Sequence, residues 1–361
     1  MKKAIDFILS TINNKPFSKK INVYGWQDEY EHLLTSSVSN YLFEDFKVTE
    51  NITPLTNENR PGNKKPKYYV TVHDTGDADP THTALFWSET VKNEYWELGK
   101  YACSYQYVVG NDGVYHQIPD DEVAWHAGDT TKFDYKLYDS CVTGTNEHPV
   151  ISISADGYYE IDGVKSFVLA PRIYKEKNGE VIIDRLATTS DINDQGILCK
   201  LVDGKYYIGE TYFNSGYMLI ANRGGNNNSI GIESCINKGT DIYYTWQKTA
   251  KLVANLLYNN NLTFDDIKQH HYFSGKDCPQ TIRRNNMWEH FLSLVKCEYD
   301  AISFLKEGYC FKLISNSNNI SSLGRVKAVE SKKNEKVIIE VSKGDLKETL
   351  NVEINLPCEV K

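Results

Sequence analysis

Residues 269–279 read QHHYFSGKDCP, and they place an imidazole and a thiol eight positions apart, at His270 and Cys278. Lys276 stands two positions before the cysteine. Imidazole nitrogen and thiolate sulfur are ligands that zinc commonly takes in proteins. The run therefore predicts half of a zinc site.

A second run, YYVTVHDTG at 68–76, is expected to supply the third ligand. Its residues alternate as in a β-strand, which puts Tyr69, Thr71 and His73 on one face. Two imidazoles and one thiolate leave the fourth position of a tetrahedral zinc open, as in catalytic sites. We therefore expect one Zn²⁺ per chain, held by His73, His270 and Cys278. A structural zinc protein would need a fourth protein ligand, for which His271 is the only adjacent candidate.

Five motifs follow one another along the chain: VHDTG, SYQYVVGNDGVYHQI (104–118), VAWHAGD (123–129), SIGIE (229–233) and HHYFSGKDCP. Their order resembles that of the zinc-dependent N-acetylmuramoyl-L-alanine amidases. This type 2 amidase family also contains peptidoglycan recognition proteins and phage lysozymes. In its branch with a cysteine ligand the last pattern is a histidine, seven residues and Cys-Pro, which His270 fits and His271 does not. The resemblance covers about 66–297 and implies an α/β fold, with a mixed central β-sheet flanked by helices.

The resemblance also implies catalytic residues. It assigns Lys276 to the catalytic lysine, whose charge would stabilise the oxyanion of the tetrahedral intermediate. Tyr105 matches a tyrosine that would hydrogen-bond the same oxyanion or the zinc-bound water, although Gln106 replaces the histidine that follows it in the family. Glu233 lies on the strand face opposite Ile230 and Ile232, so it can project into a cleft as a general base. The open alternatives are a solvated lysine, a packed tyrosine and a structural carboxylate.

Three further residues match positions that line the family's cleft, namely His126, Asn226 and Asn228. We expect them to bind substrate. The other histidines considered, at positions 32, 82, 148 and 290, are interpreted as ordinary hydrogen-bonded residues.

Residues 1–48 are predicted to form an N-terminal helical extension with helices at about 2–13 and 26–45. Residues 49–67 are polar and rich in proline, which indicates a linker or surface loop. The amidase domain is then expected over 68–297.

Within that domain, spaced apolar residues predict helices from Thr81 or Thr83 to about Leu98, at about 241–259 and at about 280–295. Gly110-Asn111-Asp112-Gly113 predicts a hairpin turn inside 104–118.

An insertion at about 138–215 has no counterpart in the family. Its runs DGYYEIDG (156–163) and DGKYYIGE (203–210) are typical of strand, turn and strand. It is either a surface elaboration or a substrate-contacting subdomain. Residues 301–361 contain four β-like runs, YCFKLIS, GRVKAV, KVIIEV and TLNVEINL, and predict a small β domain. A wall-binding module and an accessory or oligomer contact are equally open.

Composition restricts the partners. The chain has 361 residues, a net charge of −8 and no basic patch, which argues against nucleic acid. No run is apolar enough for a membrane span, and no signal peptide is expected. Eight dispersed cysteines indicate synthesis in a reducing compartment.

We therefore expect a zinc amidase that cuts the bond between N-acetylmuramic acid and L-alanine in peptidoglycan or muropeptides. The favoured setting is a phage endolysin, made in the cytoplasm and acting on the cell wall after release. The alternatives are a peptidoglycan-binding protein without activity and a cytoplasmic amidase that recycles muropeptides. In the family, the first typically lacks the cysteine ligand and the second carries aspartate at the place of Cys278. The sequence leaves the oligomeric state open.

Overall fold

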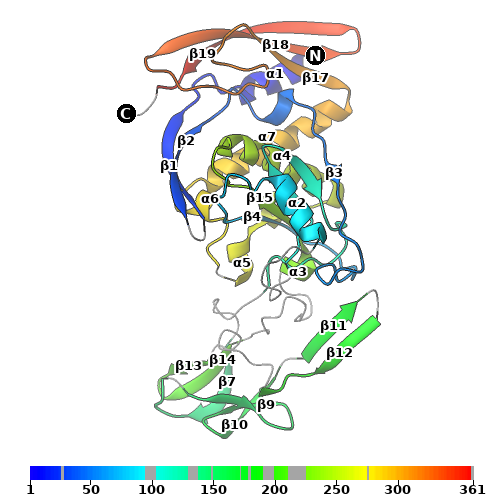
Figure 1. The fold of residues 1–361 in the computed structure, drawn as a ribbon, viewed down its shortest axis with the longest axis vertical. Coiled ribbons are helices and arrows are strands. Elements are labelled where there is room, and N and C mark those ends of the chain that lie inside the picture. The colour runs from blue at the N-terminus through cyan, green and yellow to red at the C-terminus, as the bar shows by residue number, and fades with distance from the viewer. Residues whose placement is uncertain are drawn as a thin grey trace.

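The computed structural model describes residues 1–25, 28–93, 103–128, 137–147, 149–170, 172–177, 180–189, 199–209, 225–274 and 276–358. A six-stranded sheet lies at its centre (Figure 1). Its order is β16 (Ile267–Gln269), β4 (Tyr69–Asp74), β15 (Ser229–Ser234), β5 (Tyr107–Gly110), β6 (Gly113–His116) and β3 (Thr49–Glu50). Only the hairpin of β5 and β6 is antiparallel among these neighbours. The expected mixed sheet with flanking helices is confirmed.

The two faces of the sheet differ in character. Val70 and Val72 of β4, with Ile230 and Ile232 of β15, are buried in one core with α4 (Ile242–Asn260) and α7 (Trp288–Lys306). The alternate residues of the same strands face the other way, because successive side chains of a strand point to opposite faces. That second face includes a smaller apolar cluster with α2 (Ala84–Asn93).

The predicted helix at 241–259 is confirmed as α4, which begins with the Asp241 carboxylate accepting a hydrogen bond from the Tyr244 backbone. The helix predicted at 280–295 is interrupted. It forms α6 (Gln280–Arg284) and α7, because Asn286 between them has a φ of 55°, outside the right-handed helical region. The predicted extension of α2 to Leu98, with Tyr95, falls outside the described residues.

The N-terminal helical extension is wrong beyond its first helix. That helix is α1 (Lys2–Thr11), but residues 18–35 form an antiparallel hairpin of β1 (Ser18–Tyr24) and β2 (Glu29–Thr35). A short 3₁₀ turn, η1 (Tyr41–Phe43), follows. The physical reason is a period of two in burial: Ile21 and Val23 are buried together with Leu34 of the facing strand, in the core beneath the central sheet.

The segment predicted as a linker, 49–67, is instead packed into the fold. Its β3 pairs with β6, and four of its polar side chains are buried: Asn51, Thr53, Asn59 and Asn63. Arg60 forms a two-point salt bridge with Glu122, with both N–O distances at 2.7 Å and side chains only 11% and 7% exposed. Several polar side chains of 49–67 are therefore buried and hydrogen-bonded. Their amides and the Arg60 guanidinium donate to backbone carbonyls and to carboxylates of the rest of the fold.

Replacing Arg60 by methionine is expected to lower the free energy of unfolding by about 3 kcal/mol, because it leaves Glu122 buried without its partner. Urea unfolding measures this. Lys64→Met is the matched control, since Lys64 and Asp121 form an exposed pair, 71% and 55% exposed, which should contribute nothing measurable. An Arg60→Met free energy of unfolding as close to native as that of Lys64→Met would contradict the packing of 49–67 into the fold.

The insertion forms small antiparallel sheets with a core of their own, which includes Tyr159, Ile161, Tyr206 and Ile208. Its strands are β7 (Leu137–Thr143), β8 (Ile151–Ile153), β9 (Tyr158–Ile161), β10 (Val164–Leu169), β11 (Arg172–Lys177), β12 (Glu180–Leu186), β13 (Cys199–Val202) and β14 (Lys205–Gly209). The turns Asp162-Gly163 and Asp203-Gly204 have positive φ at both residues, as tight hairpins require. The two strand–turn–strand predictions are confirmed.

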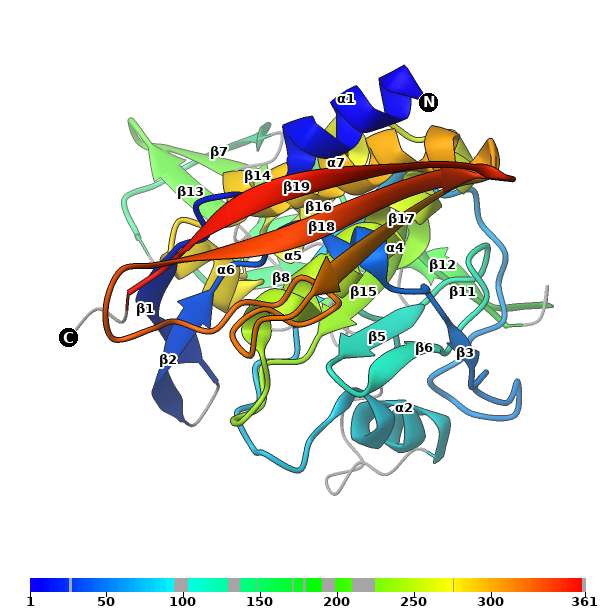
Figure 2. The same cartoon turned by 90° about the horizontal axis from the view of Figure 1, so that it is seen from above.

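The C-terminal region has three strands, not four: β17 (Tyr309–Ser315), β18 (Lys333–Lys343) and β19 (Leu346–Leu356). The run GRVKAV makes only isolated bridges, at Val326 and Val329. Ala4 and Ile8 of α1 share the core of this sheet, so the N-terminal helix packs against the C-terminal sheet (Figure 2). No helix in the described ranges is long and apolar enough to cross a membrane.

Candidate active site

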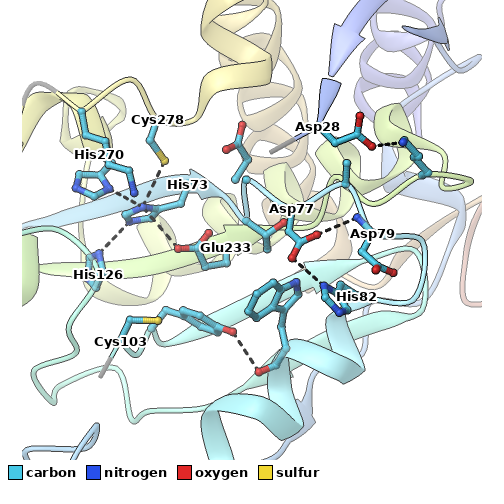
Figure 3. Close-up of a pocket in the computed structure, with 18 of the residues that line it drawn as sticks. Asp28, His73, Asp77, Asp79, His82, Cys103, His126, Glu233, His270 and Cys278 are labelled. Carbon is cyan, nitrogen blue, oxygen red and sulfur yellow. Dashed lines mark hydrogen bonds and ion pairs between the residues drawn. The ribbon is translucent and has the colours of Figure 1, made fainter. Parts of the chain in front are cut away.

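A pocket of about 600 Å³ opens where β4 and β15 end (Figure 3). The parallel register of these strands sets Glu233 directly beside His73, and both side chains line the pocket. Because Val72 and Ile232 face α4, their neighbours His73 and Glu233 must face the opposite side. The prediction that Glu233 projects into a cleft is confirmed.

The three predicted metal ligands are adjacent. His270 begins α5 (His270–Ser274) straight after β16, whose Gln269 pairs with Val72, so the chain delivers His270 next to His73. The two imidazole Nδ1 atoms lie 3.1 Å apart, and Cys278 Sγ lies 3.7 Å from Nδ1 of His73. All three donor atoms lie within 4.8 Å of one another, and all three residues are buried. Segments distant in sequence thus converge on one point.

Their donor set fits a zinc ion. Burial, then the charges of His270, His126 and Lys276, hold the pKa of His73 well below its usual range, which leaves the imidazole neutral as a metal ligand must be. Burial raises the pKa of the Cys278 thiol, so a cation would displace that proton on binding. His271 is partly exposed, and its Nδ1 donates to the Lys276 carbonyl at 3.2 Å. Within the described ranges, no fourth protein ligand joins the three.

Glu233 carries a strongly perturbed carboxyl. Its Oε1 lies 3.7 Å from Nδ1 of His73, and its Oε2 is buried with no hydrogen-bond partner in the described part of the chain. Burial raises its pKa to about 8; Lys276 opposes the shift and Asp74 adds to it. A carboxyl with a pKa near neutrality is suited to both accepting and releasing a proton.

Lys276 and Tyr105 both line the same pocket. The Tyr105 hydroxyl donates to the Trp87 carbonyl at 3.3 Å, and burial raises its pKa well above the usual value. In this arrangement the single phenol proton is directed at the Trp87 carbonyl. Tyr105 thus lines the pocket and packs against α2, and its catalytic role stays a prediction.

Of the three predicted substrate-binding residues, only His126 lines the pocket. Its Nδ1 lies 2.9 Å from Nε2 of His73. Asn226 and Asn228, in the short α3 (Gly225–Asn228), are buried away from the pocket wall. The Asn226 amide oxygen accepts the backbone N–H groups of His126 and Ala127, at 2.8 and 2.7 Å. The structure does not place either asparagine at the pocket, and the Asn226 oxygen instead satisfies two backbone donors.

Several wall residues were not predicted. Asp74 accepts the Thr281 backbone N–H at 2.9 Å, which ties β4 to the helix after Cys278, and burial raises its pKa to about 7. Asp28 reaches the pocket from the N-terminal hairpin, and Trp125 comes from the loop before His126. The only signal in the sequence was for Asp74, which follows His73 directly.

Two of the histidines interpreted as ordinary form hydrogen bonds, as expected. His82 lines the pocket but pairs with Asp77 at 2.7 Å, and His290 bonds the Tyr243 hydroxyl at 2.9 Å. His32 lies outside the pocket lining, and residue 148 falls outside the described ranges.

Residues 63–281 match the N-acetylmuramoyl-L-alanine amidase family. The N-acetylmuramoyl-L-alanine amidase CwlH of Bacillus subtilis (strain 168) is 29% identical over 135 residues, or 36% of this chain and 48% of that protein. The N-acetylmuramoyl-L-alanine amidase XlyA of the same organism is 33% identical over 70 residues, or 19% of this chain and 23% of that protein. The chain thus matches about half of one curated relative and less of the other.

Solved structures that resemble this chain do so at low sequence identity, as two of them show. The catalytic domain of XlyA gives a TM-score of 0.40 at 18% identity, over 69% of this chain and 99% of that chain. The Staphylococcus aureus hydrolase AmiA, solved in complex with its ligand, gives 0.38 at 13% identity, over 73% of this chain and 88% of that chain.

Proposed function

This chain belongs to the N-acetylmuramoyl-L-alanine amidase family, and we propose that it hydrolyses the amide bond between N-acetylmuramic acid and L-alanine in peptidoglycan. The observation that carries the proposal is the convergence of two buried imidazoles and a buried thiol beside a carboxyl of raised pKa. All four groups line one pocket large enough for part of a glycopeptide.

His73, His270 and Cys278 would hold one Zn²⁺. Zinc in such a site polarises a carbonyl oxygen and lowers the pKa of water to about 7, which supplies both an activated electrophile and a nucleophile. Two imidazoles and one thiolate leave a coordination position open for this chemistry. The remaining steps fall to the side chains around the three ligands.

Glu233 would move the proton. Its carboxylate takes a proton from the attacking water as the new C–O bond forms at the lactyl carbonyl. The same carboxyl then gives that proton to the nitrogen of L-alanine as the C–N bond breaks, which yields a free amine and a lactyl carboxylate. The unpartnered Oε2 and the pKa of about 8 support this role, because the group can hold the proton between the two steps.

Lys276 would stabilise the negative charge that develops on the carbonyl oxygen. Burial has the largest effect on the pKa values of His73, Glu233 and Cys278. The positive charge of Lys276 acts on the same three groups and lowers the pKa of each. An ammonium group at that position favours an oxyanion over a neutral carbonyl.

Replacing Lys276 by methionine is expected to lower kcat by about 10²-fold with KM little changed, because the lost interaction exists mainly in the transition state. Steady-state kinetics on a soluble muramyl peptide measures both constants. Lys238→Met is the matched control, because Lys238 also lines the pocket but pairs with Asp28, and it should leave kcat near the native value. A rise in KM alone would make Lys276 a substrate-binding residue.

The proposal is tested on purified peptidoglycan, with and without zinc chelation, by assaying new L-alanine amino groups and muramyl lactyl groups. The expected result is release of both, lost on chelation and restored by Zn²⁺. Zinc binding without amine release from walls of several peptide types would favour a peptidoglycan-binding protein. Release from soluble muropeptides but not from walls would favour the muropeptide-recycling alternative.

We further propose a wall-lysing role of the endolysin kind. All eight cysteines are free thiols, which supports synthesis in a reducing compartment. Lysis of whole cells only after the membrane is permeabilised is the expected behaviour, and turbidity assays with and without a permeabilising agent test it.

A further inference from the structure

His126 lies against the side of His73 that faces away from the other two ligands. Its Nδ1 is 2.9 Å from Nε2 of His73, whereas Nδ1 of His73 faces His270 and Cys278 (Figure 3). A neutral imidazole carries its proton on one nitrogen and a lone pair on the other. The His73 ring therefore presents its Nδ1 lone pair to the ligand cluster when Nε2–H donates to His126.

The His126 ring packs directly against the backbone of Gly231. A Cβ built on Gly231 would come within 2.6 Å of Cγ and Cδ2 of that ring, closer than any real side chain permits. Gln106 makes two hydrogen bonds to this glycine. Its side-chain Oε1 accepts the Gly231 N–H at 2.7 Å, and its backbone N–H donates to the Gly231 carbonyl at 3.1 Å. The absence of a side chain at Gly231 thus lets His126 reach His73.

The backbone beneath the ring is fixed as well. The Asn226 side-chain oxygen accepts the N–H groups of both His126 and Ala127. The rings of His126 and His73 are perpendicular, at 87°, with centroids 5.0 Å apart, so the edge of one ring meets the other. Strand β15, the turn α3 and the loop of residues 123–128 together set one nitrogen atom in place.

His126 is not itself a ligand in this arrangement. It contacts the nitrogen of His73 that lies opposite the cluster, and the group of convergent donors does not include it. A residue that orients a ligating histidine through the second ring nitrogen typically changes metal affinity about 10- to 100-fold when it is lost.

We propose that His126 is a positioning residue that selects the Nε2–H tautomer of His73 and aims its Nδ1 at the metal, with Gly231 and Asn226 setting its place. The inference rests on the proposed zinc site. It assigns to the histidine of VAWHAGD an outer-sphere role rather than the direct substrate contact expected from the sequence.

The test is zinc affinity of the full chain, measured by competition with a chromophoric chelator, together with the visible spectrum of the Co²⁺-substituted protein. His126→Leu removes the acceptor, and we expect zinc binding to weaken about 10- to 100-fold and the Co²⁺ spectrum to change. His126→Asn restores an oxygen acceptor close to the position of Nδ1 and should recover most of the affinity. His32→Asn is the control for replacing a histidine outside the pocket and should have native affinity.

Gly231→Ala pushes the His126 ring away without removing it, and it should weaken zinc binding in the same direction. His126→Leu decides the matter alone if the alanine variant does not fold. Native affinity and an unchanged Co²⁺ spectrum in His126→Leu would overturn the positioning role and leave the proposed function intact. A native chain that binds no zinc would overturn both.

Discussion

Replacing Cys278 by serine is expected to abolish stoichiometric zinc binding and to lower amide hydrolysis on purified peptidoglycan by about 10³-fold or more, which corresponds to about 4 kcal/mol of activation free energy. The physical reason is the ligand's charge. A thiolate compensates the cation in a pocket where Cys278 is only 3% exposed, whereas a serine hydroxyl stays protonated near neutral pH. Serine is close in size to cysteine, so the effect should not come from lost packing.

Metal analysis and amine release are measured on the same preparations. The matched control is Cys235→Ser, because Cys235 is also buried, at 1% exposure, but lies outside the pocket lining. We expect this control to bind one zinc and keep its activity, with some loss of stability from the buried hydroxyl. Full zinc loading and native activity in Cys278→Ser would remove cysteine from the ligand set.

Replacing Glu233 by glutamine is expected to lower kcat by about 10²- to 10⁴-fold while zinc content stays native. Glutamine has nearly the same shape but can neither take a proton from water nor pass one to the leaving amine. Steady-state kinetics with parallel metal analysis separates this variant from Cys278→Ser, which should lose both properties. A fall in zinc content in step with activity would indicate that Glu233 helps to bind the metal and does not transfer the proton.

The same variant has a signature in stability that does not depend on turnover. Burial raises the pKa of Glu233 from the ordinary value near 4.5 to about 8, so the folded zinc-free protein holds this proton more tightly than the unfolded chain does. The protonated Glu233 carboxyl therefore contributes to the free energy of unfolding. This contribution is fully present below the ordinary pKa and is lost as the pH rises through about 8. Between these values, Glu233→Gln should gain stability relative to the native chain as the pH rises, because glutamine stays neutral.

Urea unfolding of both zinc-free proteins at several pH values measures this difference. A difference that stays constant across the range would mean that the Glu233 carboxyl is ionised when the protein is folded, as in a solvated group. Glu160→Gln, in the insertion, serves as a control for removing a carboxylate outside the pocket.

The errors in the sequence-based description have a common origin. The run at 49–67 has the composition of a linker, yet Asn59 and Arg60 are held by partners from distant segments. The hairpin at 18–35 lacks a strong local signal, and its strands form because Ile21 and Val23 find the core of the central sheet. Asn226 has the right side-chain type for a cleft, but its side-chain oxygen accepts backbone N–H groups of the protein itself.

The sequence by itself determined which groups meet at the pocket. The spacing of His270 and Cys278 can be read directly from the chain. The alternation around His73 and Glu233 is also a local property, because strand periodicity fixes the face of each side chain. The tertiary structure alone decided how these groups act on one another. One example is the contact of His126 with His73 and with the backbone of Gly231. Another is the raised pKa of Glu233. Both depend on distances and burial between segments far apart in the chain, which no local pattern records.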